Sequence, residues 1–451
     1  MDEKRIYLLR DEKISKAILK LSIPMILGMM FQVFYSLVDT YFIGMLNDPN
    51  QLAAANLALP IFTLTMGLAS VIGSGASSYI SRCLGSNKHD MASKTATIAF
   101  LLLFIVSLAM TILGVIFIDP LVEFLGATSE TYKYTHDYII VMIIGLIGVM
   151  GNYALGQLLR SEGNIVKSMN GLIIGTILNI ILDPIFIFVF DMGVSGAAIA
   201  TIIGNICGTI YYVFCFMGED TSLKLDFRNI SFDKEIYIQI FKIGIPSSLT
   251  QVLVGFSTIV VNNVAITYGT LTVAGMSVAT KIMLIGTFVF IGFSSGTQPL
   301  IGYNYGMKNI NRVRESIKQG IKITFIVGVC LLLVFRTSSQ TLIGLFSNDA
   351  EVIENGSKIF NALMLSLPFM GGTMIVTSAA QAMGKAIPSL ILSVSRQGLL
   401  YIPLLIILDK ILGFNGFIYS QPITDVTMLI LSSLYLLSLL SKEKIKLEKT
   451  N

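Results

Sequence analysis

Charged side chains are scarce in this sequence. Asp, Glu, Lys and Arg make up only 13% of the 451 residues and hydrophobic residues make up 54%, whereas a soluble domain carries roughly 25% charged residues. This composition excludes a soluble globular protein and indicates a polytopic membrane protein. The chain has no Trp and only two His, and it contains no metal-ligand spacing, no nucleophile beside a base and no DxxD stretch. These absences disfavour an enzyme, a resident metal and any other cofactor.

Cysteine and net charge are low as well. Cys207, Cys215 and Cys330 lie inside apolar runs, and Cys83 falls in a predicted cytoplasmic loop. This distribution is not the paired framework of an extracellular protein, so we expect no disulfides. The formal net charge is +4, and the basic residues are scattered over the loops. The expected partner is therefore the lipid bilayer and not nucleic acid.

The most informative positive feature is an internal repeat. When the chain is shifted against itself by about 220 residues, residues that punctuate helices coincide. The matching pairs are Pro24 with Pro246, Gly85 with Gly306, Gly163 with Gly384, Pro184 with Pro403, Gly193 with Gly413 and Gly196 with Gly416. Two apolar halves with an even number of spans enter the membrane the same way up, with a cavity at their seam. This plan is typical of a secondary transporter.

Twelve apolar windows are long enough to cross roughly 30 Å of hydrocarbon. They lie near residues 21–45, 52–80, 94–118, 137–159, 167–190, 194–217, 238–267, 272–305, 317–335, 359–383, 387–408 and 415–440. We therefore predict an all-α polytopic membrane protein with twelve transmembrane helices in two pseudo-symmetric six-helix bundles. Small-residue runs inside these windows, such as GSGASS (73–78) and GFSSGTQP (292–299), are expected to let helices approach closely.

The basic residues predict the orientation of the chain. With the N-terminus in the cytoplasm, most of the 31 Lys and Arg fall in the terminal segments and the cytoplasmic loops, as the positive-inside rule requires. We expect a plasma-membrane protein with both termini cytoplasmic. The predicted parts are a cytoplasmic arm (1–20), a first bundle (21–217), a linker (218–237), a second bundle (238–440) and a basic tail (441–451).

Five charged residues fall inside the predicted spans, where a charge costs roughly 2.5 to 3.5 kcal/mol by insertion scales. Asp39 and Asp183 share a depth in the first half. Asn179 lies one helical turn before Asp183, while Asn152 and Thr201 offer polar groups at a comparable depth, so we predict one cluster. Burial and a second carboxylate disfavour the charged form, which suits proton binding near neutral pH. The same oxygens also suit Na⁺.

A structural role is the alternative for these acids. Pro184 frees a backbone carbonyl one turn earlier, and Asn179 could bond to that carbonyl.

In the second half, Arg396 and Asp425 come from adjacent antiparallel spans at similar depth, which predicts a buried ion pair. Lys281 either faces the cavity, where it would repel cations or attract a carboxylate, or pairs with Asp425 or with backbone carbonyls.

The chain resembles the multidrug and toxic compound extrusion (MATE) family of secondary transporters over essentially its whole length. The resemblance rests on SIPMILGMMFQVFYSLVDTYFIG, YISRCLGSNKHDMASKTA, LRSEGN, LNIILDPIFIF, GVSGAAIAT, PLIGYNYGMKNINRVRES, SRQGLLYIPLL and FIYSQPITD. It implies two six-helix bundles arranged in a V, alternating access between them, and export of amphipathic, mainly cationic compounds in exchange for H⁺ or Na⁺.

Carried over residue by residue, the resemblance assigns Asp39, Asn179 and Asp183 to the cation-binding cluster of the first bundle, with Asn152 and Thr201 matching less closely. Pro24 resembles the proline about which the first span bends. One branch of the family uses acids in spans seven and ten for Na⁺, and neither span has a carboxylate here. The expected coupling site is therefore in the first bundle.

Other transporters and a structural protein fit the sequence less well. A flippase of lipid-linked precursors or other endogenous metabolites would need several arginines around an anionic headgroup, and only Lys281 and Arg396 are available. A facilitator-superfamily transporter would carry a glycine, acid and double-arginine turn where this chain reads SRCLGSNKHD. A purely structural membrane protein has no use for isolated buried acids. A two-lobe transporter can function as a monomer, and we expect one here.

Overall fold

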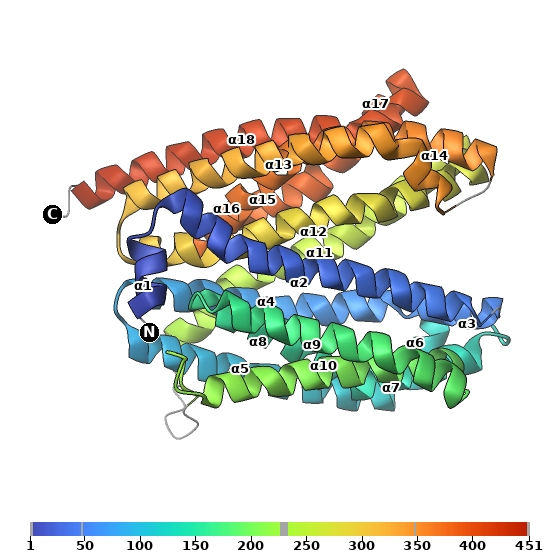
Figure 1. Ribbon diagram of the computed structural model, residues 1–451, viewed down its shortest axis with the longest axis horizontal. Coiled ribbons are helices and arrows are strands. Elements are labelled where there is room, and N and C mark those ends of the chain that lie inside the picture. Colours follow the sequence, from blue (N-terminus) through green and yellow to red (C-terminus); the bar gives the residue numbers. More distant parts are fainter. Residues whose placement is uncertain (1–2, 47, 226–232, 347–348, 449–451) are drawn as a thin grey trace. The chain divides into compact units, whose positions relative to one another are not determined.

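The computed structural model describes residues 3–46, 48–225, 233–346 and 349–448, which fold almost entirely into helices (Figure 1). The chain divides into two compact units. Unit 1 consists of the residues up to Ile6 together with Leu27–Ser248, and unit 2 consists of Tyr7–Ile26 together with the residues from Leu249 onward. Parts of the predicted linker (226–232) and of the predicted tail (449–451) lie outside the described residues.

The first half of the chain begins with the short helix α1 and continues through helices that form most of unit 1. Their bounds are α1 Glu3–Arg10, α2 Ile14–Gly44, α3 Pro49–Leu57, α4 Leu59–Gly85, α5 His89–Ile116, α6 Ile118–Phe124, α7 Tyr132–Ile144, α8 Leu146–Ser161, α9 Ile165–Pro184, the π-helical turn η1 Ile185–Val189 and α10 Gly193–Met217. Within unit 1, α9 packs along α10, and α8 lies between α4 and α10 (Figure 1).

The second half repeats this arrangement. Its elements are α11 Lys234–Ala265, the 3₁₀ turn η3 Ile266–Tyr268, α12 Thr270–Gly306, α13 Ile310–Gly344, α14 Ala350–Leu363, the 3₁₀ turn η4 Met364–Ser366, α15 Leu367–Ala382, α16 Ala386–Val394, the π-helical turn η5 Ser395–Leu399, α17 Tyr401–Leu412 and α18 Phe414–Glu448. In unit 2, α15 packs on α12 and α13, and α17 packs on α18.

The prediction of twelve spans is confirmed. Among the described residues, eleven helical segments are long and apolar enough to cross a membrane, and the pair α7 and α8, bent by 50°, makes a twelfth if it is one span. Each predicted window lies within or close to one of these segments. The helices run past the windows because polar residues continue a helix into the headgroup region, as at the start of α13, which begins at Ile310 rather than near residue 317.

Close helix packing at the small-residue runs is also confirmed. A Cβ atom on Gly75 of α4 would lie 2.0 Å from the carbonyl oxygen of Ile240 on α11, and one on Gly244 of α11 would lie 1.9 Å from that of Val71. In unit 2, a Cβ atom on Gly296 of α12 would lie 2.6 Å from Cα of Ser22 on α2. Only glycine permits such close backbone approach, so glycines in these runs set helix contacts.

These glycine contacts explain a difference from the predicted bundle boundaries. The first part of α2, up to Ile26, belongs to unit 2, and the first part of α11, up to Ser248, belongs to unit 1. The start of α2 packs on α12 within unit 2, and the start of α11 packs on α4 within unit 1. The sequence predicted bundles at 21–217 and 238–440 because hydropathy shows only where each helix crosses the membrane. It does not show which neighbouring helices each part of a helix packs against.

Candidate functional site

Two of the predicted site residues lie on α9, immediately before its end. Asp183 is fully buried and Asn179, one turn earlier, is 3% exposed. Pro184 follows Asp183 and ends the regular hydrogen-bond pattern, so the chain continues as the π-helical turn η1. Proline cannot donate to the helical ladder, and π-helical turns are frequent at functional sites. The local sequence thus places a carboxylate on the buried face of α9, beside a break in its regular helical pattern.

A hydrogen-bonded bridge joins Asp183 to the neighbouring helix α10. The amide of Asn179 is oriented by its surroundings: with its nitrogen toward Asp183, that nitrogen donates to Oδ2 at 3.0 Å, and the amide oxygen accepts from Oγ1 of Thr201 at 3.1 Å. This orientation gives both amide atoms suitable partners, which is the basis on which amide groups are assigned. Thr201 is 8% exposed. The structure therefore brings together Asp183, Asn179 and Thr201.

Asn152 on α8 joins the same chain of polar groups at its other end. Its amide nitrogen donates to Oδ1 of Asn205 at 3.0 Å, and the Asn205 amide donates to the carbonyl oxygen of Thr201 at 2.8 Å. The Oδ1 atom of Asn152 is buried and accepts no hydrogen bond from the residues that the structure describes. Asn152 thus connects to Thr201 through Asn205. Its own Oδ1 atom can still accept a hydrogen bond.

Asp39 lies on α2, and among the described residues no hydrogen bond joins its side chain to the cluster. Tyr35, one turn before Asp39, places its hydroxyl 3.2 Å from Oγ1 of Thr201. Asp39 is half-buried, and its carboxylate is an electrostatic neighbour of Asp183 and of the tyrosines Tyr35 and Tyr138. In the described part of the chain, neither Asp39 nor Asp183 forms an ion pair. The predicted cluster residues therefore all lie in unit 1, and their two carboxylates have no cationic partner among the described residues.

Three residues of this region were not predicted from the sequence. Tyr35 and Asn205 each lie four residues from a predicted site residue, Asp39 and Thr201 respectively, so the one-turn spacing that connected Asn179 to Asp183 would have found both. Tyr138 lies on α7, far from the others in the sequence, and only the packing of α7 in unit 1 brings it near the carboxylates. No local pattern indicates it.

Pro24 lies within α2, which remains helical on both sides of it. Its ring removes one backbone donor, so the carbonyl of Lys20 loses its usual helical partner and bending there is easier. Pro24 belongs to unit 2, whereas Asp39, on the same helix, belongs to unit 1. The structure therefore does not place Pro24 in the polar cluster.

The intramembrane charges of the second half are arranged differently. Nε of Arg396, in η5, donates to Oδ1 of Asp425 on α18 at 3.0 Å, and the Gln421 amide donates to Oδ2 at 3.2 Å. The Asp425 side chain is fully buried and that of Arg396 is 12% exposed. Lys281 on α12 is exposed and has no ion-pair partner among the described residues. Asp425 is thus bonded by Arg396 and Gln421, and Lys281 does not pair with it.

The chemistry available at the unit 1 cluster is the binding of a small cation. Its groups are two carboxylates, amide oxygens and hydroxyl groups, which are hard oxygen donors. No group of three or more His, Cys, Asp or Glu side chains that could hold a metal ion occurs in the residues that the structure describes. Carboxylate, amide and hydroxyl oxygens of this kind can take up and release H⁺ or a monovalent ion without covalent chemistry.

Comparisons with known proteins identify the family. The MatE family model matches the chain twice, at residues 24–185 and 246–407. The multidrug export protein MepA of Staphylococcus aureus (strain MRSA252) is 32% identical over 426 residues, which is 94% of each chain. MepA of Staphylococcus saprophyticus is also 32% identical, over all of this chain and 99% of its own.

A solved structure shows the same fold over nearly the full length. The outward-facing conformation of a multidrug resistance MATE family transporter of the MOP superfamily superposes with a TM-score of 0.94 at 29% identity, covering 98% of this chain and 99% of that one. The double match of the family model agrees with the internal repeat found in the sequence. The chain therefore belongs to the MatE family, and it is a membrane transporter rather than an enzyme.

Proposed function

We propose that this protein is a plasma-membrane antiporter that exports amphipathic, mainly cationic compounds in exchange for H⁺ or Na⁺. The observation that carries this proposal is the pair of carboxylates, Asp39 and Asp183, close to each other in unit 1 without a cationic partner in the described chain. A buried carboxylate that lacks a fixed cation needs a proton or a mobile cation to balance its charge. That need is the basis of ion coupling.

Two further observations support the substrate and the orientation. The relatives are named as multidrug export proteins, and an exporter of varied drugs needs a tolerant, apolar binding surface, which 21 Met and 27 Phe can supply. The concentration of Lys and Arg in the terminal segments and in alternate loops supports cytoplasmic termini. Each unit has its own set of spans, and a monomer suffices for the mechanism.

The proposed cycle uses the cluster as the ion switch. In the outward-open state, Asp39 and Asp183 take up the ion, the helices around them rearrange, and the bound compound leaves to the outside. In the inward-open state, the ion is released and a new compound binds. Coupling requires the ion and the compound to favour opposite states by a few kcal/mol. The bridge from Asp183 through Asn179 to Thr201 provides the route by which a change in charge reaches α10.

Pro24 has a proposed role in the same cycle. A helix bends most readily at proline because one backbone hydrogen bond is missing there. Asp39 lies about four turns further along α2, so binding of an ion at Asp39 would favour one conformation of a helix that already has a weak point. We expect Pro24→Ala to slow efflux while leaving ion binding at the cluster intact.

The deciding experiment is gradient-driven efflux of a fluorescent cationic dye from cells that express the full chain. Wild type is compared with Asp39→Asn and Asp183→Asn under an imposed pH gradient and, separately, an imposed Na⁺ gradient. Asp90→Asn is the matched control, because Asp90 is an exposed acid that pairs with Lys94 at 2.7 Å outside the cluster. Membrane expression is measured for every variant.

We expect both cluster variants to lose gradient-driven efflux and the control to keep it, and the gradient that drives wild type names the ion. Efflux that survives both substitutions would remove the cluster from the mechanism. Absence of dye efflux even from wild type would reject the cationic-drug substrate and direct the search to lipid-linked or other endogenous compounds.

A further inference from the structure

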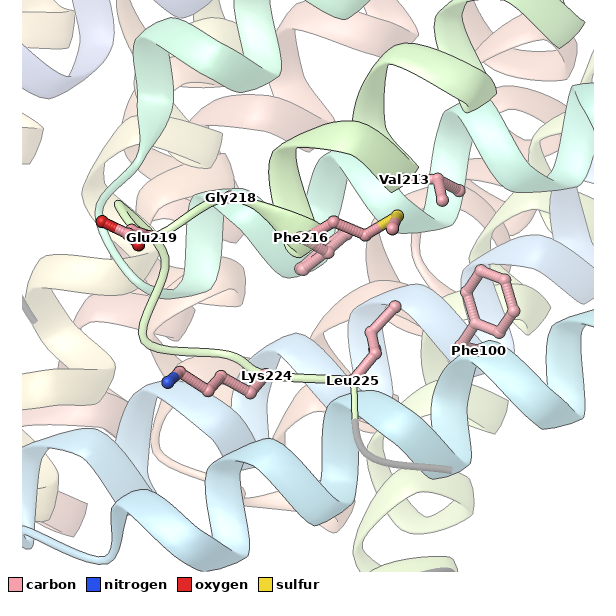
Figure 2. Close-up of a pocket in the computed structure, with 8 residues that line it drawn as sticks. Phe100, Val213, Phe216, Gly218, Glu219, Lys224 and Leu225 are labelled. Atoms are coloured by element: carbon pink, nitrogen blue, oxygen red, sulfur yellow. The ribbon is translucent and has the colours of Figure 1, made fainter. Parts of the chain in front are cut away.

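Unit 1 contains a second feature, separate from the Asp183 cluster. A pocket of about 730 Å³ lies where α10 ends, between the end of α10, the segment that follows it and the neighbouring helix α5 (Figure 2). Its lining residues are Phe100 from α5, Val213, Phe216 and Met217 from α10, and Gly218, Glu219, Lys224 and Leu225 from the following segment. None of these residues takes part in the proposed ion coupling.

The pocket is amphipathic along its length. Figure 2 shows Glu219 and Lys224 together at one end, and Phe100 and Val213 at the other. Phe100 lies about three turns into α5, and Val213 lies about one turn before the end of α10. The apolar end is therefore formed by span residues and the charged end by the residues just beyond a span, so the polarity of the pocket follows that of the membrane surface.

The segment that carries the charged end is held in place by hydrogen bonds. Glu162, fully buried at the end of α8, accepts from Oγ1 of Thr221 at 3.0 Å and from the backbone N–H of Ser222 at 2.8 Å. On the other side, Oγ of Ser93 on α5 donates to the Ser222 carbonyl oxygen at 3.2 Å. These bonds fix the segment between Glu219 and Lys224, so the pocket is a built feature of unit 1.

The two charges at the pocket mouth are available to a ligand. Glu219 and Lys224 are both exposed, and neither has a hydrogen-bond or ion-pair partner within the described residues. Their neighbour Asp220 is instead engaged by Lys167, with Nζ to Oδ2 at 3.4 Å. The mouth thus offers one positive and one negative group beside an apolar slot.

We propose that this pocket binds one membrane phospholipid with a zwitterionic, primary-amine headgroup, of the phosphatidylethanolamine type. The phosphate lies against Lys224, the ammonium lies against Glu219, and part of an acyl chain packs along Phe100, Val213 and Leu225. The pairing of Lys224 with a phosphate and of Glu219 with an ammonium group favours this headgroup over others. A phosphatidylglycerol headgroup has no cation for Glu219, a choline headgroup has no N–H to donate to a carboxylate, and a cationic drug would meet Lys224 without a balancing anion.

The test measures lipid binding to the purified, delipidated full-length protein in detergent. Native mass spectrometry counts bound phosphatidylethanolamine and phosphatidylglycerol with identical acyl chains, over a range of added lipid. The variants are Lys224→Gln, Glu219→Gln and Val213→Trp, which fills the slot without changing a charge. Lys318→Gln, an exposed lysine on α13 of unit 2, is the matched control, and gel filtration checks that each variant is folded.

We expect one saturable site in wild type that prefers phosphatidylethanolamine. Lys224→Gln should weaken binding of both lipids about fivefold, because one basic residue at a lipid surface contributes about 1 kcal/mol. Glu219→Gln should remove the preference between the two headgroups, Val213→Trp should abolish saturable binding, and the control should match wild type.

Several outcomes would overturn the proposal. Equal binding of the two lipids by wild type would reject the headgroup assignment, and saturable binding that survives Val213→Trp would place the lipid elsewhere. Displacement of bound lipid by a cationic dye that binds this pocket more tightly in wild type than in Val213→Trp would assign the pocket to an export substrate. Because Lys224→Gln and Glu219→Gln change exposed side chains, their readings remain valid even if Val213→Trp does not fold.

Discussion

The two units bury their intramembrane charges in opposite ways. In unit 2, Asp425 receives hydrogen bonds from Arg396 and Gln421, and its charge is balanced within the protein. In unit 1, Asp183 is equally buried, but among the described residues its hydrogen bond comes from the neutral amide of Asn179, and none of those residues pairs Asp39 with a cation either. Both arrangements adjoin a π-helical turn, η1 in unit 1 and η5 in unit 2.

Under the proposed function, this difference distinguishes the structural charge of Asp425 from the ion-coupling charge of Asp183. A carboxylate that is neutralised by a fixed guanidinium has little reason to exchange a proton or a cation. A carboxylate beside only amides and hydroxyls is balanced by whatever cation the solution supplies. Both halves match the same family model, and in our proposal the ion chemistry belongs to unit 1 alone.

The largest effect is expected from giving unit 1 the charge balance of unit 2. Asn179→Lys places an ammonium one turn from Asp183, where it neutralises the carboxylate permanently. We expect gradient-driven efflux to fall to background, with protein still in the membrane. Asn179→Leu removes the same hydrogen bonds without adding charge and is the control, measured by the same dye assay. If Asn179→Leu keeps some coupled efflux and Asn179→Lys keeps none, the charge balance is the cause; identical losses would contradict this account.

The next effect is on stability and comes from breaking the ion pair of unit 2. Arg396→Gln leaves Asp425 buried without its cation, which typically costs about 3–5 kcal/mol. We expect a large fall in the thermal unfolding midpoint in detergent. The double variant Arg396→Leu with Asp425→Leu removes both charges and should recover most of the loss. Efflux per folded molecule should remain close to wild type in the double variant, and its loss would give the pair a role in transport.

The sequence predicted a large part of this picture because several of its signals are local. Hydropathy gave all twelve spans, and the one-turn spacing of Asn179 and Asp183 placed them on one face. The same spacing logic could have reached Tyr35 and Asn205. Tyr138 could not be predicted, because its position depends on how α7 packs in unit 1, and the unit changes within α2 and α11 could not be predicted because hydropathy does not report packing partners.

A smaller effect should come from the buried carboxylate that holds segments onto unit 1. Oε1 of Glu162 forms an ion pair with Nη1 of Arg5 on α1 at 3.3 Å, and Oε2 accepts a hydrogen bond from the backbone N–H of Ser222. Glu162→Gln keeps the shape but removes the charge, so these charge-assisted bonds weaken and we expect a loss of about 1–3 kcal/mol. Thermal unfolding in detergent measures it. Lipid binding at the pocket formed by the anchored segment should weaken in parallel, and unchanged stability would show that Arg5 and Ser222 do not need the charge.

Unit 2 also contains a buried, ion-paired glutamate, Glu12. Glu12 is 6% exposed and accepts from Nζ of Lys20 at 2.8 Å. That hydrogen bond, together with the charge of Lys16, lowers the pKa of Glu12. Its stabilising contribution is therefore complete above the unfolded pKa, about 4.3, and is lost as the pH falls through the lower folded pKa. We expect Glu12→Gln to be less stable than wild type at pH 7, with the difference narrowing below about pH 4.

The smallest effects are expected at two helix caps, Asp48 before α3 in unit 1 and Asp349 before α14 in unit 2. Asp349 accepts from the backbone N–H groups of Glu351 and Val352 at 2.9 and 3.2 Å, and Asp349→Ala should cost about 1 kcal/mol. Asp48 accepts from the Gln51 amide at 3.1 Å and the Asn50 N–H at 2.9 Å, and these bonds lower its pKa.

The Asp48 cap should therefore show a defined pH dependence. Its contribution is present above the unfolded pKa of about 3.9 and disappears as the pH falls through the lower folded value. Asp48→Ala should lower the thermal midpoint at pH 7 and approach wild type near pH 3, whereas Asp48→Asn, which keeps an oxygen acceptor but cannot titrate, should lose little at either pH. Efflux should be unchanged in all three cap variants, because neither cap touches the unit 1 cluster. A cap variant that abolished coupling would mean that the two units differ in more than the charge balance around Asp183 and Asp425.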